Sequence, residues 1–123
     1  MATGTQDVTQ DQNFKVEGLT IKSSTGTAAA GAVTLNAYSG VVTSEALTTA
    51  QNASYTLTIT NSFIAATDLV FASLKNGTNT QGTPVIVRVT PAAGSLVIIV
   101  KNMHDSAQAL NGTIVITFVA LRA

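Results

Sequence analysis

The chain has no cysteine, no tryptophan and few charged residues, and each shortage limits what kind of protein it is. Without cysteine, neither disulfide bonds nor thiolate metal sites can hold the fold, which excludes the disulfide-stapled secreted scaffolds. Charged residues make up 10% of the 123 residues, against about 25% in an ordinary soluble domain. The formal net charge is +0, so the sequence gives no argument for nucleic acid or for an anionic membrane as a partner.

The shortage of charge has to be reconciled with a positive mean hydropathy. Either threonine, serine, asparagine and glutamine solvate the surface, or much of the surface is buried in an assembly, and we expect both. The length fits one domain with a single core. Aromatic residues are only 5%, so the core must consist of valine, isoleucine, leucine and alanine. That composition suits a thin sandwich and argues against an aromatic platform for sugars.

The first segment, Met1–Asn13, is polar and holds only Val8 as a sizeable apolar side chain after Met1. We expect a flexible arm, either simply disordered or ordered by a partner, followed by one domain over residues 14–123. The arm has neither the basic nor the apolar region of a signal peptide. The longest aliphatic run, Leu96–Val100, is far shorter than the ~20 residues that span a bilayer. The sequence therefore predicts a protein made in a cytosol that stays soluble or is assembled there.

The central stretch, Pro84–Val100, reads as two strands joined by a turn. In the first strand the valines recur at every second position, which predicts that Val85, Val87 and Val89 share a core face. Thr90–Gly94 supplies the reversal, because proline fixes φ and glycine tolerates a positive φ.

Two strands are apolar on both faces, namely the return strand Leu96–Val100 and the final strand Thr113–Leu121. Strands of this kind are covered from two sides, by their own core and by something else. We therefore predict a homo-oligomer whose interface is a second apolar face. That face is formed by Val97, Ile99, Val115, Val119 and Leu121.

The rest of the chain alternates between short strands and polar connections. Further strands are predicted at Phe14–Lys22, Ala32–Glu45 (kinked at Ser39-Gly40), Ser54–Asn61 and Leu69–Leu74. The clearest has Tyr55, Leu57 and Ile59 facing inward with threonines between them. Loops are predicted at Ser23–Gly31, Ala46–Ala53, Ser62–Asp68 (with a possible helical turn), Lys75–Thr83 (a hairpin loop) and Asn102–Gly112 (with a tight turn at Asn111-Gly112). This spacing predicts an all-β fold, an antiparallel β-sandwich with a jelly-roll-like arrangement.

No constellation of residues indicates catalysis. His104 is the only histidine, and its neighbours Asp105 and Ser106 are too close in sequence to converge on it as a triad does. Gly77–Thr83 has the glycine spacing of a phosphate loop but lacks the lysine, and no helix is predicted after it. Asn-x-Ser/Thr sites occur at Asn52, Asn76 and Asn111, and we interpret them as turns. We expect no enzyme activity, no cofactor and no metal.

A family resemblance carries more information than any motif. The matching segments, in chain order, are LNAYSGVVTSE (35–45), LTTA (47–50), YTLTITN (55–61), NGTN (76–79), TPAAGS (90–95), VKN (100–102) and NGT (111–113). This order resembles a β-sandwich domain in structural proteins of tailed bacteriophages, notably head decoration (cement) proteins and head-fibre bases. The similarity covers about residues 32–121.

The resemblance implies a non-enzymatic virion component on the capsid exterior, made in the cytoplasm of the host bacterium. Such proteins are often trimers seated between major capsid protein subunits, where they brace the shell. The arm would then contact the capsid, through Gln6, Asp7, Val8 and Asp11. The alternative is a fibre or tail recognition module that binds host carbohydrate, with only Tyr38 and Tyr55 available to stack on a sugar. A bacterial surface subunit is disfavoured by the absence of a signal peptide.

Overall fold

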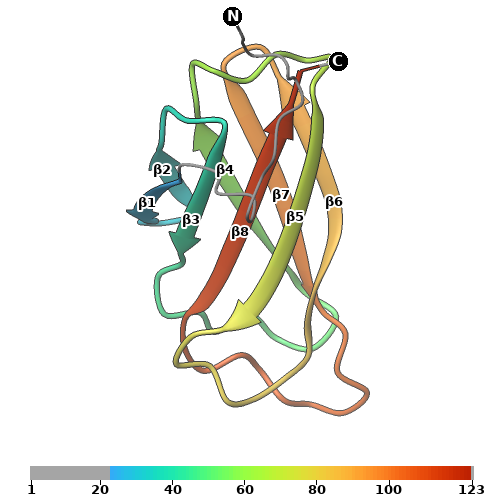
Figure 1. Cartoon of the computed structure of the whole chain (residues 1–123). Coiled ribbons are helices and arrows are strands. Elements are labelled where there is room, and N and C mark those ends of the chain that lie inside the picture. The colour runs from blue at the N-terminus through green and yellow to red at the C-terminus, as the bar shows by residue number, and fades with distance from the viewer. Residues whose placement is uncertain (1–22, 123) are drawn as a thin grey trace, which may run out of the picture.

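The computed structural model describes residues 23–122, and all regular structure in this range is β-strand (Figure 1). The strands, in chain order, are β1 (Ser24–Thr27), β2 (Ala32–Thr34), β3 (Ser39–Thr43), β4 (Ser54–Thr60), β5 (Leu69–Asn76), β6 (Pro84–Ala92), β7 (Ser95–Asn102) and β8 (Ile114–Leu121). The arm Met1–Asn13 and the predicted strand Phe14–Lys22 lie outside the described residues. The all-β prediction is confirmed for the described part of the chain.

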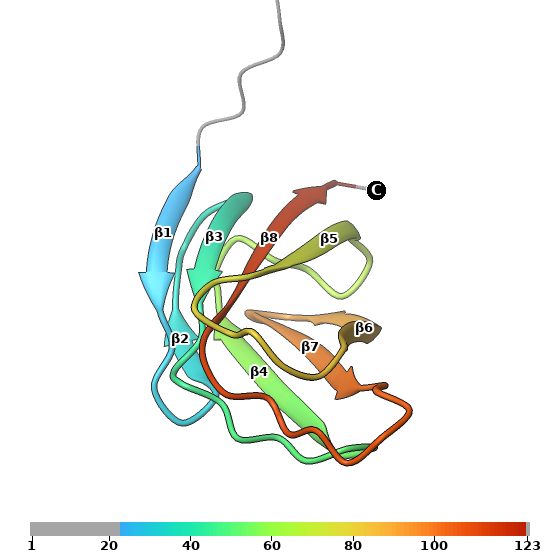
Figure 2. The ribbon, with the colours of Figure 1, turned by 90° about the horizontal axis from the view of Figure 1, so that it is seen from below.

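The strands form two four-stranded sheets, in the orders β1-β3-β8-β5 and β2-β4-β7-β6. Viewed from below, the sheets lie as two layers that face each other (Figure 2). Most neighbours are antiparallel, but β1 pairs with β3, and β2 with β4, in parallel. Both sheets are therefore mixed, which corrects the expectation of an antiparallel arrangement. The jelly-roll-like arrangement is not confirmed.

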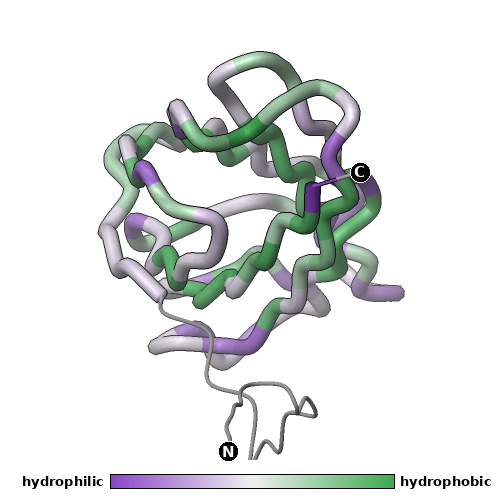
Figure 3. The backbone as a smooth tube through the Cα atoms, turned by 45° about the horizontal axis from the view of Figure 1, so that its top comes forward, coloured by the Kyte–Doolittle hydropathy of each residue, from purple (hydrophilic) through white to green (hydrophobic). Residues whose placement is uncertain are grey.

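A single hydrophobic core lies between the layers. The first sheet contributes Val42, Ile114, Ile116 and Phe118, and the second contributes Leu57, Ile59, Leu96, Ile98 and Val100. Apolar segments accordingly follow the strands in Figure 3. The core is aliphatic apart from Phe118 and Tyr55, as the low aromatic content predicts.

The inward and outward alternation of β4 and β7 is confirmed. In β4 the side chains of Tyr55, Leu57 and Ile59 are buried, and the threonines between them are less buried or exposed. Threonine suits the outer side of a pleat because it is β-branched and polar at the tip. In β7 the inner residues have no exposed surface, whereas Val97 and Ile99 on the other face are half-buried.

The hairpin of β6 and β7 is confirmed, but the prediction for the β6 core face is wrong. The register shifts between Ile86 and Arg88, so Val87 occupies a β-bulge. Ile86 and Val89 therefore pack against the core, while Val85 and Val87 are exposed. The turn is also shorter than predicted.

Pro91 lies within β6 and is paired with Leu96, so it is not a turn residue. A proline is tolerated there because β6 is an edge strand. Gly94 supplies the reversal with a φ of 83°.

The segment from Ser23 to Glu45 also differs from its prediction. Ser23–Gly31 was expected to be a loop, but it contains β1, which pairs with β3 along its whole length. The predicted extended segment Ala32–Glu45 is two strands in different sheets, because the chain leaves β2 after Thr34 and enters β3 at Ser39. The predicted kink lies at the start of β3.

Two connections, of which Lys75–Thr83 was predicted to be a hairpin loop, join the two sheets. Lys75–Thr83 leads from β5 in one sheet to β6 in the other, and Asn102–Gly112 leads from β7 to β8 in the same way. At Asn111-Gly112, where a tight turn was predicted, the chain only bends. The connection Ser62–Asp68 has turns and no helical turn, while Ala46–Ala53 is a loop as predicted.

Candidate functional site

The residues predicted to form one oligomer interface lie on two opposite faces. Val97 and Ile99 belong to β7 and face outward from the β2-β4-β7-β6 sheet. Val115, Val119 and Leu121 belong to β8 and face outward from the other sheet. The prediction that these residues point away from the core is confirmed. The assumption that they share one patch is wrong, because β7 and β8 are in different layers.

On the β7 face, polar neighbours flank the two apolar residues. Val97 is paired with Thr58 on one side and Thr90 on the other. Ile99 is paired with Thr56 and Arg88. These neighbours leave both residues half-buried. The exposed apolar residues of the adjacent strand, Val85 and Val87, lie beside charged residues, because Val85 is paired with Lys101 and Val87 precedes Arg88.

On the β8 face, apolar side chains are neighbours in register. Leu121 is paired with Leu69, and Val119 is paired with Phe71. Leu69 is 52% exposed, Phe71 is 56% exposed and Leu121 is 48% exposed. We call these four residues (Leu69, Phe71, Val119 and Leu121) the outer apolar patch. Leu69 and Phe71 were not among the predicted interface residues, because the β5 pattern alone does not show what lies beside them.

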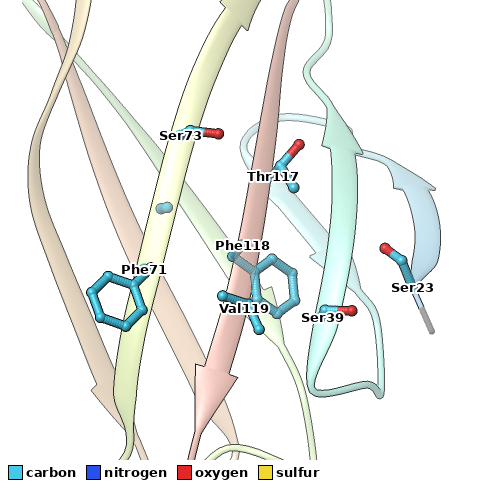
Figure 4. A pocket seen from close by; sticks show the side chains of 8 residues that line it. Ser23, Ser39, Phe71, Ser73, Thr117, Phe118 and Val119 are labelled. Atoms are coloured by element: carbon cyan, nitrogen blue, oxygen red, sulfur yellow. The ribbon is translucent and has the colours of Figure 1, made fainter. Parts of the chain in front are cut away.

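A hollow of about 310 Å³ crosses this face and is lined in part by the patch residues Phe71 and Val119 (Figure 4). It extends from Ser23, at the start of the described chain, across β3 and β8 to β5. Its outward-facing lining residues include Ser39, Phe71, Ser73, Thr117 and Val119. The lining therefore combines an apolar row with short hydroxyl side chains and contains no charged group.

An aromatic corner adjoins the C-terminal end of β8. The rings of Tyr38 and Phe63 meet edge to face with centroids 5.0 Å apart. Arg122 lies 5.7 Å from the Tyr38 ring centroid and donates hydrogen bonds to the Tyr38 hydroxyl and the Phe63 carbonyl. A second hollow, of about 380 Å³, is lined by both rings and by Ser24 and Asn36.

Asp68 lies beneath this corner with a fully buried side chain. Its Oδ2 accepts a hydrogen bond from the Ala65 backbone N–H at 2.9 Å. Its Oδ1 lies 3.3 Å from Arg122 Nε but receives no well-aligned hydrogen bond, so charge attraction is what compensates that oxygen. The pair ties the end of β8 to the start of β5.

The second tyrosine considered for sugar stacking, Tyr55, is not available on the surface. Its ring is buried, and its hydroxyl donates a hydrogen bond to Glu45 Oε1 at 3.0 Å. Burial, followed by the bond to Glu45 and that carboxylate's charge, raises the pKa of Tyr55 well above its usual range. Of the two tyrosines, only Tyr38 presents an exposed ring.

His104 lies in the β7–β8 connection, with its neighbours gathered around a single ring nitrogen. The Ser106 backbone N–H donates to Nδ1 at 3.1 Å, and the Asp105 carboxylate lies 3.6 Å from the same atom. A nucleophile triad needs the serine and the carboxylate on opposite ring nitrogens. The arrangement is that of a tight polar turn. Within residues 23–122 there is no group of three or more metal-ligating side chains.

Three buried asparagines, Asn61, Asn79 and Asn102, organise the loops at the two ends of the sheets. From the sequence, only Asn61 had a suggested role, as a possible cap of a short helical turn, and Asn79 and Asn102 had none. Asn102 Oδ1 accepts from the Thr83 and His104 N–H groups, and its Nδ2 donates to the Thr49 and Gln108 carbonyls. Asn79 and Asn61 bond the loops near them in a similar way. These residues resemble ordinary loop asparagines in the sequence. Asn61 directly follows β4 and Asn102 ends β7, whereas Asn79 lies in the loop after β5.

Comparison with protein-family models, with curated proteins and with solved structures gives no match. Among the described residues, no helix is long and apolar enough to cross a bilayer.

Proposed function

We propose that the chain is a non-enzymatic structural protein of a phage virion that decorates the capsid as a trimer and stabilises it. The outer apolar patch is the observation that supports an assembly. It places three apolar side chains, each about half exposed, next to one another on a chain with 10% charged residues. The phage assignment rests on the family resemblance of residues 32–121.

In this proposal the patch contributes to the contact between copies, and the arm Met1–Asn13 contacts the capsid. With so few charges, attachment would rest mainly on shape, apolar contacts and backbone pairing. Binding should therefore survive salt concentrations that screen electrostatic attraction. Several sites engaged by one trimer would add avidity on a repeating lattice.

The contact between copies is tested by placing a charge in the patch. Leu69→Asp and Leu121→Asp change exposed positions, so the fold should survive while the oligomer dissociates, because a carboxylate buried in the contact costs several kcal/mol. Thr56→Asp is the matched control, since it is exposed on the outer face of the other sheet. The readout is sedimentation at micromolar concentration. An intact protein that sediments as a stable monomer would refute the assembly.

The role on the capsid is tested by adding purified protein to shells that lack it, at low and high salt. We expect occupancy at both salt concentrations and a higher melting temperature of the shell. No binding, or binding without this increase, would count against a cementing role.

The alternative, a carbohydrate-recognition module, has one feature in its favour. The exposed ring of Tyr38 borders the hollow of about 380 Å³, with the Asn36 amide beside it. Aromatic faces and amides are groups that bind sugars, although one tyrosine is a small platform. Binding to isolated host glycans that is lost in Tyr38→Ala would favour this function over capsid decoration.

A further inference from the structure

The backbone hydrogen bonds of β8 show which way its neighbour β5 directs its own backbone groups. The Ala120 N–H donates to the Tyr38 carbonyl, and the Ile114 carbonyl accepts from the Ser44 N–H, both on the β3 side of β8. Backbone groups alternate in direction along a strand. The even-numbered residues of β8 therefore bond toward β3, and the odd-numbered residues bond toward β5.

The same alternation identifies the free groups of β5. The odd-numbered residues of β8 are paired with odd-numbered residues of β5, so the N–H and C=O groups of Val70, Ala72 and Leu74 point away from β8. β5 ends its layer (Figure 2), and no strand within residues 23–122 pairs with its far side. In that range, no backbone bond outside the β5–β8 ladder reaches these three residues. Such an edge binds an extended strand through its backbone.

The other edges of the two sheets are less suited to accepting a strand. β1 has 4 residues and β2 has 3, so each offers few backbone groups. β6 is long, but Pro91 has no N–H to donate and the bulge at Val87 interrupts the regular spacing. β5 combines a length of 8 residues with an unbroken register.

We propose that β5 pairs with β5 of a second copy, antiparallel and about a two-fold axis at Ala72, so that two four-stranded sheets join into one. A second copy is the occupant because the edge is complementary to itself. With Ala72 opposite Ala72 of the second copy, Val70 lies opposite Leu74 of that copy, and each such pair exchanges two hydrogen bonds. The free groups of all three residues are then paired in both copies.

The outer side chains of β5 also fit this register. Phe71 lies opposite Ser73 of the second copy, and the two Phe71 rings are diagonal neighbours, so the outer apolar patches of the two copies adjoin on one face. Leu69 lies opposite Lys75 of the second copy. The two Lys75 side chains lie at opposite ends of the pairing, where they do not repel each other.

The pairing joins copies in twos and goes beyond the proposed function, because it needs a second copy but no capsid. In a trimer held by other surfaces, the same edge would link one trimer to the next. Leu69→Asp separates the two kinds of contact. A contact through the face of the patch would bury the carboxylate and be lost, whereas the edge pairing would place it opposite Lys75 of the second copy and persist.

Two matched lysine variants provide the first test. Ser73 and Thr117 are both exposed, face the same way and are paired in register on β5 and β8. In Ser73→Lys the two new ammonium groups arise on side chains about 7–8 Å apart across the axis, so we expect the dissociation constant to rise about tenfold at low salt and less at high salt. Thr117→Lys lies one strand further from the axis and should leave association unchanged. Sedimentation at micromolar concentration gives both constants.

A spin label provides the second test, on a chain without native cysteine. Labels on Ser73→Cys should lie close enough to broaden the electron paramagnetic resonance spectrum, and dilution with unlabelled protein should remove the broadening. Thr56→Cys, exposed on the other sheet, should show none.

Three results would overturn the pairing: a stable monomer, an unbroadened spectrum from the label at position 73, or equal weakening by Ser73→Lys and Thr117→Lys. A trimer that Ser73→Lys leaves intact, with no broadening, would overturn the pairing and leave the proposed function in place. A dimer that Ser73→Lys dissociates would support the pairing even if the protein bound no capsid.

Discussion

Replacement of Asn102 by alanine tests whether one buried side chain holds the loops at the lower end of the molecule in Figure 1 together. Asn102 has no exposed surface, and all its hydrogen-bonding groups are used. Its bonds reach three segments: the β3–β4 loop at Thr49, the start of β6 at Thr83, and the β7–β8 connection at His104 and Gln108. Gly82 fits beside it because a Cβ there would lie 3.0 Å from its amide atoms.

The expected cost follows from the bonds that are lost. A typical intramolecular hydrogen bond contributes about 1 kcal/mol net, so the bonds to Asn102 sum to about 4 kcal/mol. Gln108 and the loop around His104 are partly exposed, and water can replace some of these partners. We therefore expect Asn102→Ala to lower the free energy of unfolding by about 2–4 kcal/mol. For a domain of this size that corresponds to a melting temperature lower by roughly 8–16 °C.

Urea unfolding followed by far-UV circular dichroism suits a chain without tryptophan. The matched control is Asn36→Ala, because Asn36 is exposed and its side chain accepts one bond, from the Ser62 N–H. We expect this control to cost less than about 1 kcal/mol. If Asn102→Ala costs no more than Asn36→Ala, the buried network does not hold the loops and the reasoning is wrong.

Three further outcomes follow from the core, the ion pair and the buried tyrosine. Phe118→Ala should cost about 3–5 kcal/mol in urea unfolding, because its ring is 1% exposed between the sheets. Arg122→Met should lower the free energy of unfolding by about 1–2 kcal/mol, because it leaves the buried Asp68 carboxylate without its cation. The cost stays this small because Arg122 is exposed and water screens the pair. In an Asp68→Asn background the same Arg122→Met substitution should cost less. Because the pKa of Tyr55 is raised in the folded protein, the hydroxyl loses its proton at a lower pH in the unfolded chain than in the folded one. The stabilisation that comes from this difference is complete below about pH 10, the ordinary pKa of tyrosine, and is lost as the pH rises further. When unfolding is measured between pH 7 and 11, the free energy of unfolding should fall less at alkaline pH for Tyr55→Phe than for the unaltered protein. At neutral pH this variant should be less stable by about 1 kcal/mol, because the hydrogen bond to Glu45 is missing.

The sequence predicts strands well where apolar and polar residues alternate without interruption. In Ser54–Thr60 each threonine separates two core residues, and the observed burial follows that pattern. β6 shows where the alternation of apolar residues fails as a guide. The bulge at Val87 changes which face of the sheet every residue on one side of it points to. β1 was missed because Ser-Thr-Gly-Thr has no hydrophobic period, and its pairing with β3 is decided by tertiary contacts.

The candidate surface was predictable only in part, for a related reason. Alternation identifies the two faces of a strand but not the sheet to which the strand belongs. Lys75–Thr83 and Asn102–Gly112 contain the glycine and asparagine signals of hairpins, yet both connect different sheets. If β7 and β8 lay in the same sheet, Val97 and Val119 would be on one face, as the sequence analysis predicted. In the structure, Val119 has Phe71 beside it instead.

The two long edge strands, β6 and β5, differ in how open they are to pairing with another strand. At the edge of the β2-β4-β7-β6 sheet, β6 carries Pro91, a bulge at Val87 and the exposed Arg88, all of which oppose pairing with another strand. At the edge of the other sheet, β5 pairs with β8 in unbroken register, and Lys75 is its only charged residue. The outer apolar patch belongs to this second sheet. These features favour the β5 edge over the β6 edge for pairing with another strand, and β5 borders the proposed contact between copies.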